Sequence, residues 1–334
     1  MKIRLLLLGL VIFLLVFMCV GCLDKVFGPI EETETEKNKE KDKATEVDAT
    51  NENYLDIDFY VVDDTTNKLL PVSINYPRKE GIAYATVMEL VSGSDIHQKI
   101  EGYDLSLPLL EGTEVLGINI DEKAAVVDFN NQLLNFEDQN QEKLAVTSLV
   151  YTLTQYSTIE KVQIRIAGSI VEELTHGTKV NLPISRETLG INVEVEDGVD
   201  LKNSDKITVY HPVLRNETNL YIPVTRVINS NQNHLKTAVG LYLNGADFSQ
   251  PFEEESEVMK TQVKENVAVV SLSKEFTSYP KQMEEGIVKS LILTITELDR
   301  IEKVQLLIEG HPKVLPAGTD LNNIMDRPAF AKIN

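Results

Sequence analysis

Cysteine is almost absent from this chain, and its scarcity excludes several kinds of chemistry. The two cysteines are Cys19 and Cys22, both close to the N-terminus. A signal segment that ends before Cys22 would leave one cysteine in the mature chain. One cysteine cannot form an internal disulfide or a thiolate metal site, and this one lies outside the predicted folded region. A cysteine nucleophile in the folded region is excluded for the same reason.

Basic residues are too few for a nucleic-acid binder. The chain has 32 Lys and Arg against 52 Asp and Glu, which gives a formal net charge of -20. Contact with phosphates requires a basic face. The same charge opposes adhesion of the folded part to anionic lipid. We therefore expect no nucleic acid among the partners.

Motifs for catalysis or for metal binding are missing as well. The five histidines show no HExxH-type ligand spacing, and no G-x-S-x-G elbow is present. Asp63 and Asp64 could suggest cation binding or glycosidase chemistry, but "VVDDTTNK" is also typical of a hairpin turn. Asp128 aligns with Ser271 in the second copy described below. The sequence therefore predicts no catalytic residue, no metal and no cofactor. The histidines are His97, His176, His211, His234 and His311.

The N-terminus is typical of a bacterial secretory signal. Lys2 and Arg4 precede an apolar run, and Gly21 precedes Cys22. The Gly-Cys junction resembles a lipobox, with Cys19 where leucine is usual. We expect residues 1–21 to be a lipoprotein signal peptide and Cys22 to carry the membrane lipid. The alternative is an uncleaved anchor, because the apolar run is about long enough to cross a hydrocarbon core of roughly 30 Å.

Residues 22–52 are predicted to form a charged, disordered tether. The stretch "EETETEKNKEKDKATEVDATNEN" offers almost nothing to bury. As a random coil it would span roughly 30 Å, and fully extended it would approach 100 Å. A solvated helix of Glu and Lys pairs is the alternative. Whether the N-terminal segment carries a lipid at Cys22 or stays as an uncleaved anchor, the basic end stays inside and the two domains described below face outward.

The rest of the chain is a repeat. "LVYTLTQYSTIEKVQI" (149–164) aligns with "LILTITELDRIEKVQL" (291–306), and "AAVVDF" aligns with "VAVVSL". The period of roughly 140 to 150 residues is too long for a solenoid, so each copy is a domain. We expect domains at 53–190 and 205–334, joined by a linker at 191–204. Each copy is taken as complete in itself.

Within each copy the order of elements is the same. Two strands are followed by a helix that ends near Gly93 or Gly245, then by two strands, a second helix and a closing strand. The fold class is therefore α+β, with a three- to five-stranded sheet packed by two helices. Proline cannot donate to a ladder, so the strands with Pro71 and Pro223 are expected at exposed sheet edges.

Turns and loops give two further expectations. Gly168 and Gly310 follow the closing strand without the Lys-Ser/Thr of a phosphate loop, so we expect backbone turns with positive φ. The copies differ most in one loop, which is "SDIHQKIEGYDLSLPLLEGT" in the first and includes the acidic "FEEESE" in the second. Partner contacts are expected there. What the copies share is expected to be almost entirely core.

The lipobox, the tether and the doubled segments together resemble the GerM family, which has two tandem GerMN (sporulation and spore germination) domains. The segments that carry the resemblance are "LVYTLTQYSTIEKVQIRIAG", "LILTITELDRIEKVQLLIEG", "AAVVDF", "VAVVSLSKEF" and "LPLLEGTEV". The second copy lacks the "P-x-x-x-G-T" turn. The resemblance implies a small module like the ring-building modules of secretion systems. It also implies a lipid-anchored protein on the outer face of the mother-cell membrane, facing the forespore.

In function, the resemblance implies a scaffold whose partners are protein subunits of a sporulation transenvelope complex, with effects on germination. Two alternatives remain open from the sequence. One is an enzyme that acts on the peptidoglycan of the spore envelope. The other is a solute-binding lipoprotein, although such proteins have strands that cross between lobes.

Overall fold

A computed structural model describes residues 53–230 and 233–333, which belong to one compact unit spanning Thr50–Asn334. The predicted signal peptide, Cys22 and the tether lie outside the described residues.

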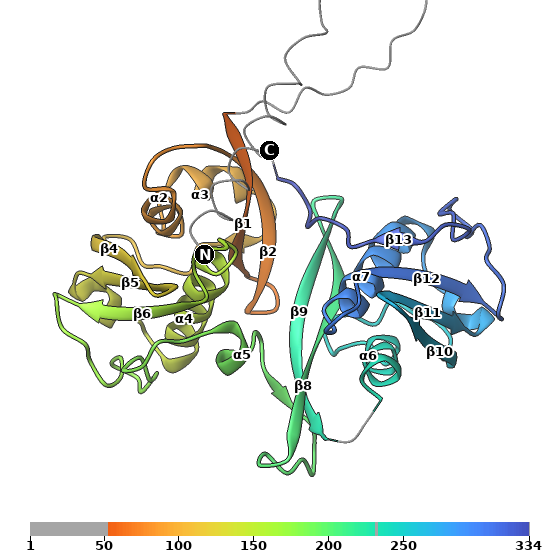
Figure 1. Ribbon diagram of the computed structural model, residues 1–334. Helices are drawn as coiled ribbons and strands as arrows, with labels where there is room; N and C mark the ends of the chain where they lie inside the picture. Colours follow the sequence, from red (N-terminus) through yellow and green to blue (C-terminus); the bar gives the residue numbers. More distant parts are fainter. Residues whose placement is uncertain (1–52, 231–232, 334) are drawn as a thin grey trace, which may run out of the picture. The chain divides into compact units, whose positions relative to one another are not determined.

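The first repeat begins with a long hairpin of β1 (Tyr54–Asp63) and β2 (Lys68–Pro77), in which Tyr60 lies opposite Pro71 (Figure 1). A second sheet contains β4, β5 and β6 in that order, with β4 antiparallel and β6 parallel to β5. The remaining bounds are β3 (Leu105–Ser106), β4 (Val115–Asp121), β5 (Ala124–Phe129), β6 (Lys161–Ile166), α2 (Ile82–Glu89), α3 (Asp95–Ile100), α4 (Gln139–Leu153) and α5 (Arg186–Leu189).

The second repeat has the same order of elements, except that residues 244–257 form no counterparts of α3 and β3. Its hairpin is β8 (Ser204–Arg215) and β9 (Thr218–Asn229), with Tyr210 opposite Pro223. Its hairpin and its remaining strands lie in the sheets β7-β9-β8 and β10-β11-β12-β13, where β7 comes from the segment that precedes the second repeat. The remaining bounds are β7 (Glu194–Val195), α6 (His234–Leu243), β10 (Val258–Lys264), β11 (Val267–Leu272), α7 (Glu284–Thr296), β12 (Lys303–Ile308) and β13 (Met325–Asp326).

The two parallel strands of each repeat are joined by its longest helix. A parallel connection needs a crossover, and α4 and α7 supply it between β5 and β6 and between β11 and β12. Alternate residues of β5 are buried beneath the helix. The α+β fold class is confirmed, and the strands of each repeat are divided between two sheets.

Two main hydrophobic clusters fill the unit, and the first is not confined to the first repeat. It also contains Ile333 and four residues from the hairpin of the second repeat. The expectation that each copy is complete in itself is therefore wrong, because the first core is closed by side chains of the second copy. The four hairpin residues are Val213, Leu220, Ile222 and Val224.

The loop expected to contact partners in the first repeat is largely folded into the protein. It forms α3 and β3, and β3 pairs with Val62 and Asp63 of β1. Its apolar side chains face inward because the longer loop can reach the core. The buried ones are Ile96, Ile100, Leu105, Leu107 and Leu109.

The turn glycines confirm the sequence analysis. Gly168 and Gly310 have φ values of 82° and 81°, with nothing within 4 Å of an added Cβ, so backbone conformation alone requires glycine there. Gly245, at φ 68°, follows the C-cap of α6. In the first repeat the helix ends earlier, at Glu89, and Gly93 lies in the turn beyond it.

Candidate functional site at the junction of the repeats

The side chains of Asp63 and Asp64 make structural hydrogen bonds within the protein. The Asp63 carboxylate is buried and accepts two bonds from Arg215 of the second repeat, at 2.7 and 3.0 Å. It also accepts the N–H and hydroxyl of Thr66, as the turn context indicated. Asp64 accepts the hydroxyl of Ser106 at 2.6 Å. Asp63 is thus part of the junction between repeats.

Asp128 and Ser271 perform the same structural task, although the sequence suggested an unshared position. The Asp128 carboxylate accepts the N–H of Gly168 at 2.8 Å. The Ser271 hydroxyl accepts the N–H of Gly310 at 2.9 Å. Aspartate and serine both have an oxygen at the right reach, so either can cap this turn.

The five histidines are dispersed. His234 pairs with Asp205 at 3.0 Å, and a ring nitrogen of His176 lies 2.7 Å from the Phe136 carbonyl. His97 and His311 are exposed, and His211 is buried. In the described part of the chain, no three His, Cys, Asp or Glu side chains are grouped so that they could hold a metal.

The expectation that the copies share little beyond their cores is wrong, and the clearest shared polar group is a buried glutamate. Glu142 accepts the N–H groups of His176 and Thr178 at 2.7 and 3.2 Å. In the second repeat the equivalent residue, Glu284, accepts those of Ala317 and Thr319 at 2.7 and 2.9 Å.

Both carboxylates are at most 1% exposed. Burial raises the pKa of Glu284, but the bonds from Ala317 and Thr319 outweigh it and hold the pKa below its ordinary value. Each glutamate therefore anchors the Gly-Thr turn of its repeat.

A second shared group is an arginine that closes each repeat. Arg186 donates to the carbonyl of Tyr151 and to the Thr154 hydroxyl, at the C-terminal end of α4. Arg327 makes the same two contacts at the end of α7, with Leu293 and Thr296. Cations are favourable at a helix C-terminus, because unpaired carbonyls lie there.

Each of these arginines also lies over a tyrosine of the first hairpin strand. The distance from the guanidinium to the ring centre is 5.6 Å both for Arg186 over Tyr60 and for Arg327 over Tyr210. The two tyrosines are equivalent, since the N–H of each bonds to a threonine of the long helix, Thr152 or Thr294.

Beyond its arginine, each repeat extends a tail onto the other. After Arg186, the carbonyl of Ile191 accepts the N–H of Thr225 at 2.9 Å, and β7 pairs in parallel with β9. After Arg327, the carbonyl of Ala331 accepts the N–H of Ser73 at 2.9 Å, also in parallel. The repeats thus exchange tails reciprocally, and strands do cross between them.

The exchanged tails cover the strand edges on which Pro71 and Pro223 lie. Pro71 and Pro223 are buried, so the expectation of exposed edges is wrong. β2 ends its sheet as expected, whereas β9 lies between β7 and β8. The Asn192 amide bridges the two proline strands, since its nitrogen donates to the Leu69 and Pro223 carbonyls, both at 2.7 Å. A side chain therefore satisfies one backbone carbonyl on each of the two proline strands.

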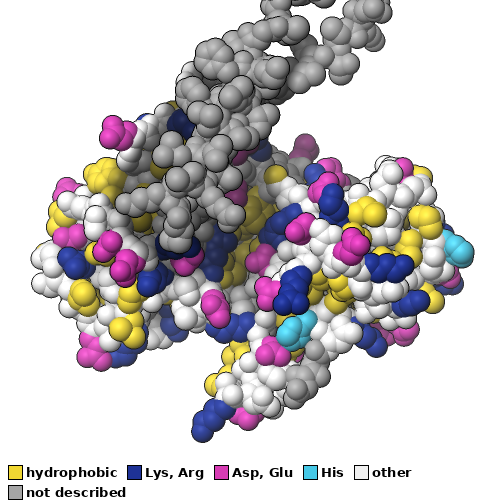
Figure 2. Space-filling model, in the orientation of Figure 1, with side chains coloured by type: hydrophobic (Ala, Val, Ile, Leu, Met, Phe, Trp, Pro, Cys, Tyr) yellow, Lys and Arg dark blue, Asp and Glu magenta, His cyan; other side chains and the backbone are white. Residues whose placement is uncertain are grey.

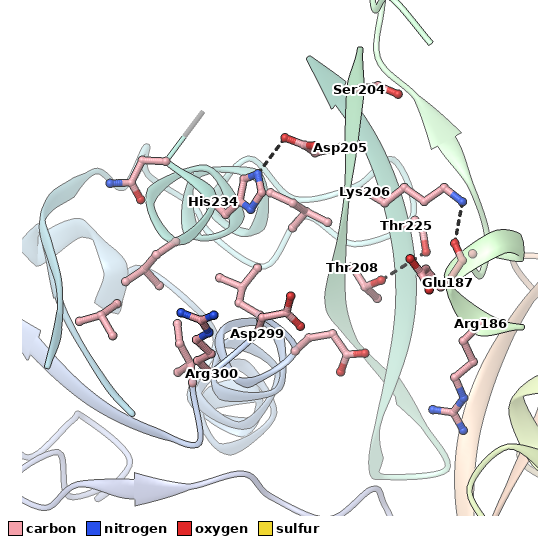
Figure 3. A pocket seen from close by; sticks show the side chains of 18 of the residues that line it. Arg186, Glu187, Ser204, Asp205, Lys206, Thr208, Thr225, His234, Asp299 and Arg300 are labelled. Atoms are coloured by element: carbon pink, nitrogen blue, oxygen red, sulfur yellow. Dashed lines mark hydrogen bonds and ion pairs between the residues drawn. The ribbon is translucent and has the colours of Figure 1, made fainter. Parts of the chain in front are cut away.

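A cleft of about 1100 Å³ opens at this junction, between α5 and the second repeat (Figure 3). Its apolar part includes Ile207, Leu235 and Val263, and charged side chains surround it. Lys206 crosses to α5 and donates to the carbonyls of Glu187 and Thr188, both at 3.0 Å.

The charges of the cleft are mixed, and several of them are paired. Asp205 faces His234, and the hydrogen bond from His234, followed by that from Ser230, lowers the pKa of the Asp205 carboxyl. A general acid needs the opposite shift. Glu297 is paired with Arg327 at 2.6 Å. The cleft has the dimensions of a binding site.

The surface gives no sign of a single large charged field on the face shown. Acidic, basic and apolar side chains are interspersed there (Figure 2). Among the helices of residues 53–230 and 233–333, none combines the length and hydropathy needed to cross a membrane.

Sequence reasoning missed Glu142, Arg186 and their partners in the second copy, although a signal was present. The glutamates lie 142 positions apart, as the helices around them do, and each arginine follows a Gly-Thr pair. Lining up these polar positions would have identified both. Asn192 carries no such signal, because its role depends on two strands that meet only in the fold.

These features define the class of protein: a tandem-repeat α+β unit in which two copies of one small module exchange tails. A family model described as "Germane: Sporulation and spore germination" matches residues 58–172 and 208–314, more than half of the chain. The chain belongs to this family.

Relatives agree with this assignment. The chain is 28% identical over 321 residues to "Spore germination protein GerM" of Bacillus subtilis (strain 168), covering 90% of this chain and 82% of that protein. The solved tandem GerMN domains of the sporulation protein GerM from B. subtilis superpose with a TM-score of 0.70 at 24% identity, over 84% of this chain and 99% of that one. The likeness to this solved structure shows that the two chains share a fold.

Proposed function

We propose that this protein is a non-catalytic, membrane-tethered scaffold that acts in sporulation and spore germination. The observation that carries the proposal is the family match over both repeats, together with a relative named as a spore germination protein. The exchanged tails support it, because they hold two copies of one module in a single compact unit. A unit of this kind can present two similar surfaces at a fixed spacing.

The proposed location is the outer face of the mother-cell membrane, facing the forespore. The anchor is lipid on Cys22, and residues 23–52 give the reach. The sequence pattern before Cys22 supports lipidation, and two acyl chains give stable anchoring. The proposed partners are protein subunits of a complex that crosses the envelope.

The test is made in sporulating cells of the source organism. A deletion strain should produce fewer germinating spores, and native electrophoresis of its membranes should lack a large assembly that the intact gene restores. Cys22→Ala should move the protein from the membrane to the soluble fraction. Normal sporulation, together with an unchanged pattern of membrane complexes in the deletion strain, would remove the proposal.

A second candidate is solute binding, which the cleft of about 1100 Å³ favours. A thermal-shift screen with small ligands separates the two functions. A ligand at 100 times its dissociation constant stabilises a protein by about 2.7 kcal/mol. The solute-binding function requires that such a shift be lost when Lys206, which lines the cleft, is changed to Glu.

A further inference from the structure

The segment Arg327–Ile333 leaves the second repeat and ends on the first. Arg327 is held at α7, and the Phe330 ring lies 5.9 Å from that of Tyr210. The chain then reaches β2, where Ala331 accepts the N–H of Ser73 and Ile333 donates to the Ser73 carbonyl, at 2.9 and 3.0 Å. The segment makes a short parallel bridge, centred on Lys332, along the edge of β2.

The edge of β2 has features that would make it bind some peptide sequences in preference to others. The Ile333 side chain is fully buried in the first hydrophobic cluster. One residue earlier, the Lys332 ammonium lies 2.8 Å from the Asp56 carboxylate, and this contact lowers the pKa of Asp56. Backbone bonds of an added strand give affinity, whereas pockets for alternate side chains give specificity.

The equivalent edge of β9 is held by more contacts. There the tail of the first repeat is fixed by Asn192, which donates to the Pro223 carbonyl, by Ile191, which donates to the Thr225 hydroxyl, and by Glu194, which pairs with Arg226. On β2, beyond Phe330, the added strand has the two bonds of Ser73, one buried side chain and one ion pair exposed to water. The strand on β2 is the more weakly held half of the exchange.

We propose that the β2 edge around Ser73 is a strand-acceptor site that the chain fills with its own residues 331–333. The site fits an extended protein segment that runs parallel to β2, with a branched apolar residue in the Ile333 pocket and a cation one residue before it. A partner strand of this chemistry competes with the chain's own segment. This goes beyond the scaffold function proposed above and does not depend on it.

The test displaces residues 331–333 from the β2 edge by mutation and then measures whether a peptide binds there. Ile333→Asp in the full chain places a charge in the pocket and should release the segment. A fluorescent peptide of residues 325–333 should then bind, and its binding should be at least about tenfold weaker when it carries the same Ile333→Asp change, because that change costs more than about 1.4 kcal/mol. The wild-type chain should not bind the peptide at about 100 µM, since a tethered segment competes at an effective concentration on the order of millimolar.

Amide hydrogen exchange supplies the second measurement and its internal control. The Ser73 amide should exchange faster in Ile333→Asp and regain protection with the peptide. The Thr225 amide, which Ile191 holds, should be unchanged in both states. Lys332→Ala, which removes only the exposed ion pair, should leave Ser73 protected.

Two results would overturn the proposal. One is loss of protection at Ser73 and Thr225 together, which would make the segment an inseparable part of the fold. The other is a Ser73 amide that stays protected in Ile333→Asp. If Ile333→Asp does not fold, Ile333→Ala keeps the backbone bonds and weakens the pocket alone, and the same measurements apply.

Discussion

Asp63 and Arg215 form an ion pair between the repeats, with two hydrogen bonds of 2.7 and 3.0 Å and side chains that are 0% and 14% exposed. The residues lie 152 positions apart, and each stands at the end of the first strand of a hairpin. The pair therefore ties the turn of one hairpin to the turn of the other.

Breaking this pair from one side should be costly. Arg215→Met leaves the Asp63 carboxylate buried without its cation, and we expect a loss of about 3–5 kcal/mol in the free energy of unfolding. Denaturant unfolding measures it. In the double variant Asp63→Leu, Arg215→Met no buried charge remains, so the stability lost to the unpaired charge should return, apart from about 1 kcal/mol for each of the two bonds from Thr66. Equal losses in the single and double variants would show that the charge itself is unimportant.

The buried glutamates should anchor the Gly-Thr turns independently in the two repeats. Glu284→Gln weakens the bonds from Ala317 and Thr319, and a loss of about 1.5–3 kcal/mol is expected in chemical unfolding. Glu142→Gln should cost a similar amount. The matched control is the neighbouring Glu285, whose exposed pair with Lys289 should contribute less than about 1 kcal/mol. A Glu284→Gln variant as stable as Glu285→Gln would contradict the anchoring role.

Asp128 should be replaceable by the residue of the other repeat. Because Ser271 caps Gly310 as Asp128 caps Gly168, Asp128→Ser should change stability little, whereas Asp128→Ala should cost about 1 kcal/mol. Thermal unfolding measures both. The same variants test the alternative of an envelope enzyme: if the protein released peptidoglycan fragments and Asp128→Ser abolished the release, the structural assignment would fail.

His211 should make the fold sensitive to mild acid. Its ring stacks on Tyr242, and burial, followed by the charges of Arg226 and Lys68, lowers its pKa to about 3. In the unfolded chain its pKa is near 6.5, so between these values the unfolded state binds the extra proton. The stability from neutral His211 is complete above about pH 6.5 and falls as the pH drops.

The slope from His211 should approach about 1.4 kcal/mol per pH unit. Unfolding is measured between pH 6.5 and 5, above the range in which carboxylates ordinarily titrate, and the comparison with a His211 variant isolates the contribution of this residue from that of the other histidines. His211→Gln should flatten this slope, and His97→Gln, at an exposed position, should not. An equally steep slope in His211→Gln would place the effect elsewhere.

Sequence patterns predicted the elements well where burial repeats at short range. The alternating and helical spacing of apolar residues located the strands and the long helices α4 and α7, and the turn at Gly168 followed from local backbone chemistry. The polar anchors were missed because each is a single residue whose partner is a backbone group. The sequence does not show that the N–H of Thr319 lies beside Glu284, although this hydrogen bond defines the anchoring role of Glu284.

The sequence by itself determined that the chain holds two copies of one α+β module, because hydrophobic periodicity and turn residues are local properties. Only the tertiary structure decided that the copies exchange tails and that the edges at Pro71 and Pro223 are covered. The exchange is made by backbone hydrogen bonds, which every residue type can form, and by a few side chains such as Asn192 and Ile333. Their partners lie more than 100 positions away or in the other copy, so their roles exist only once both hairpins have folded.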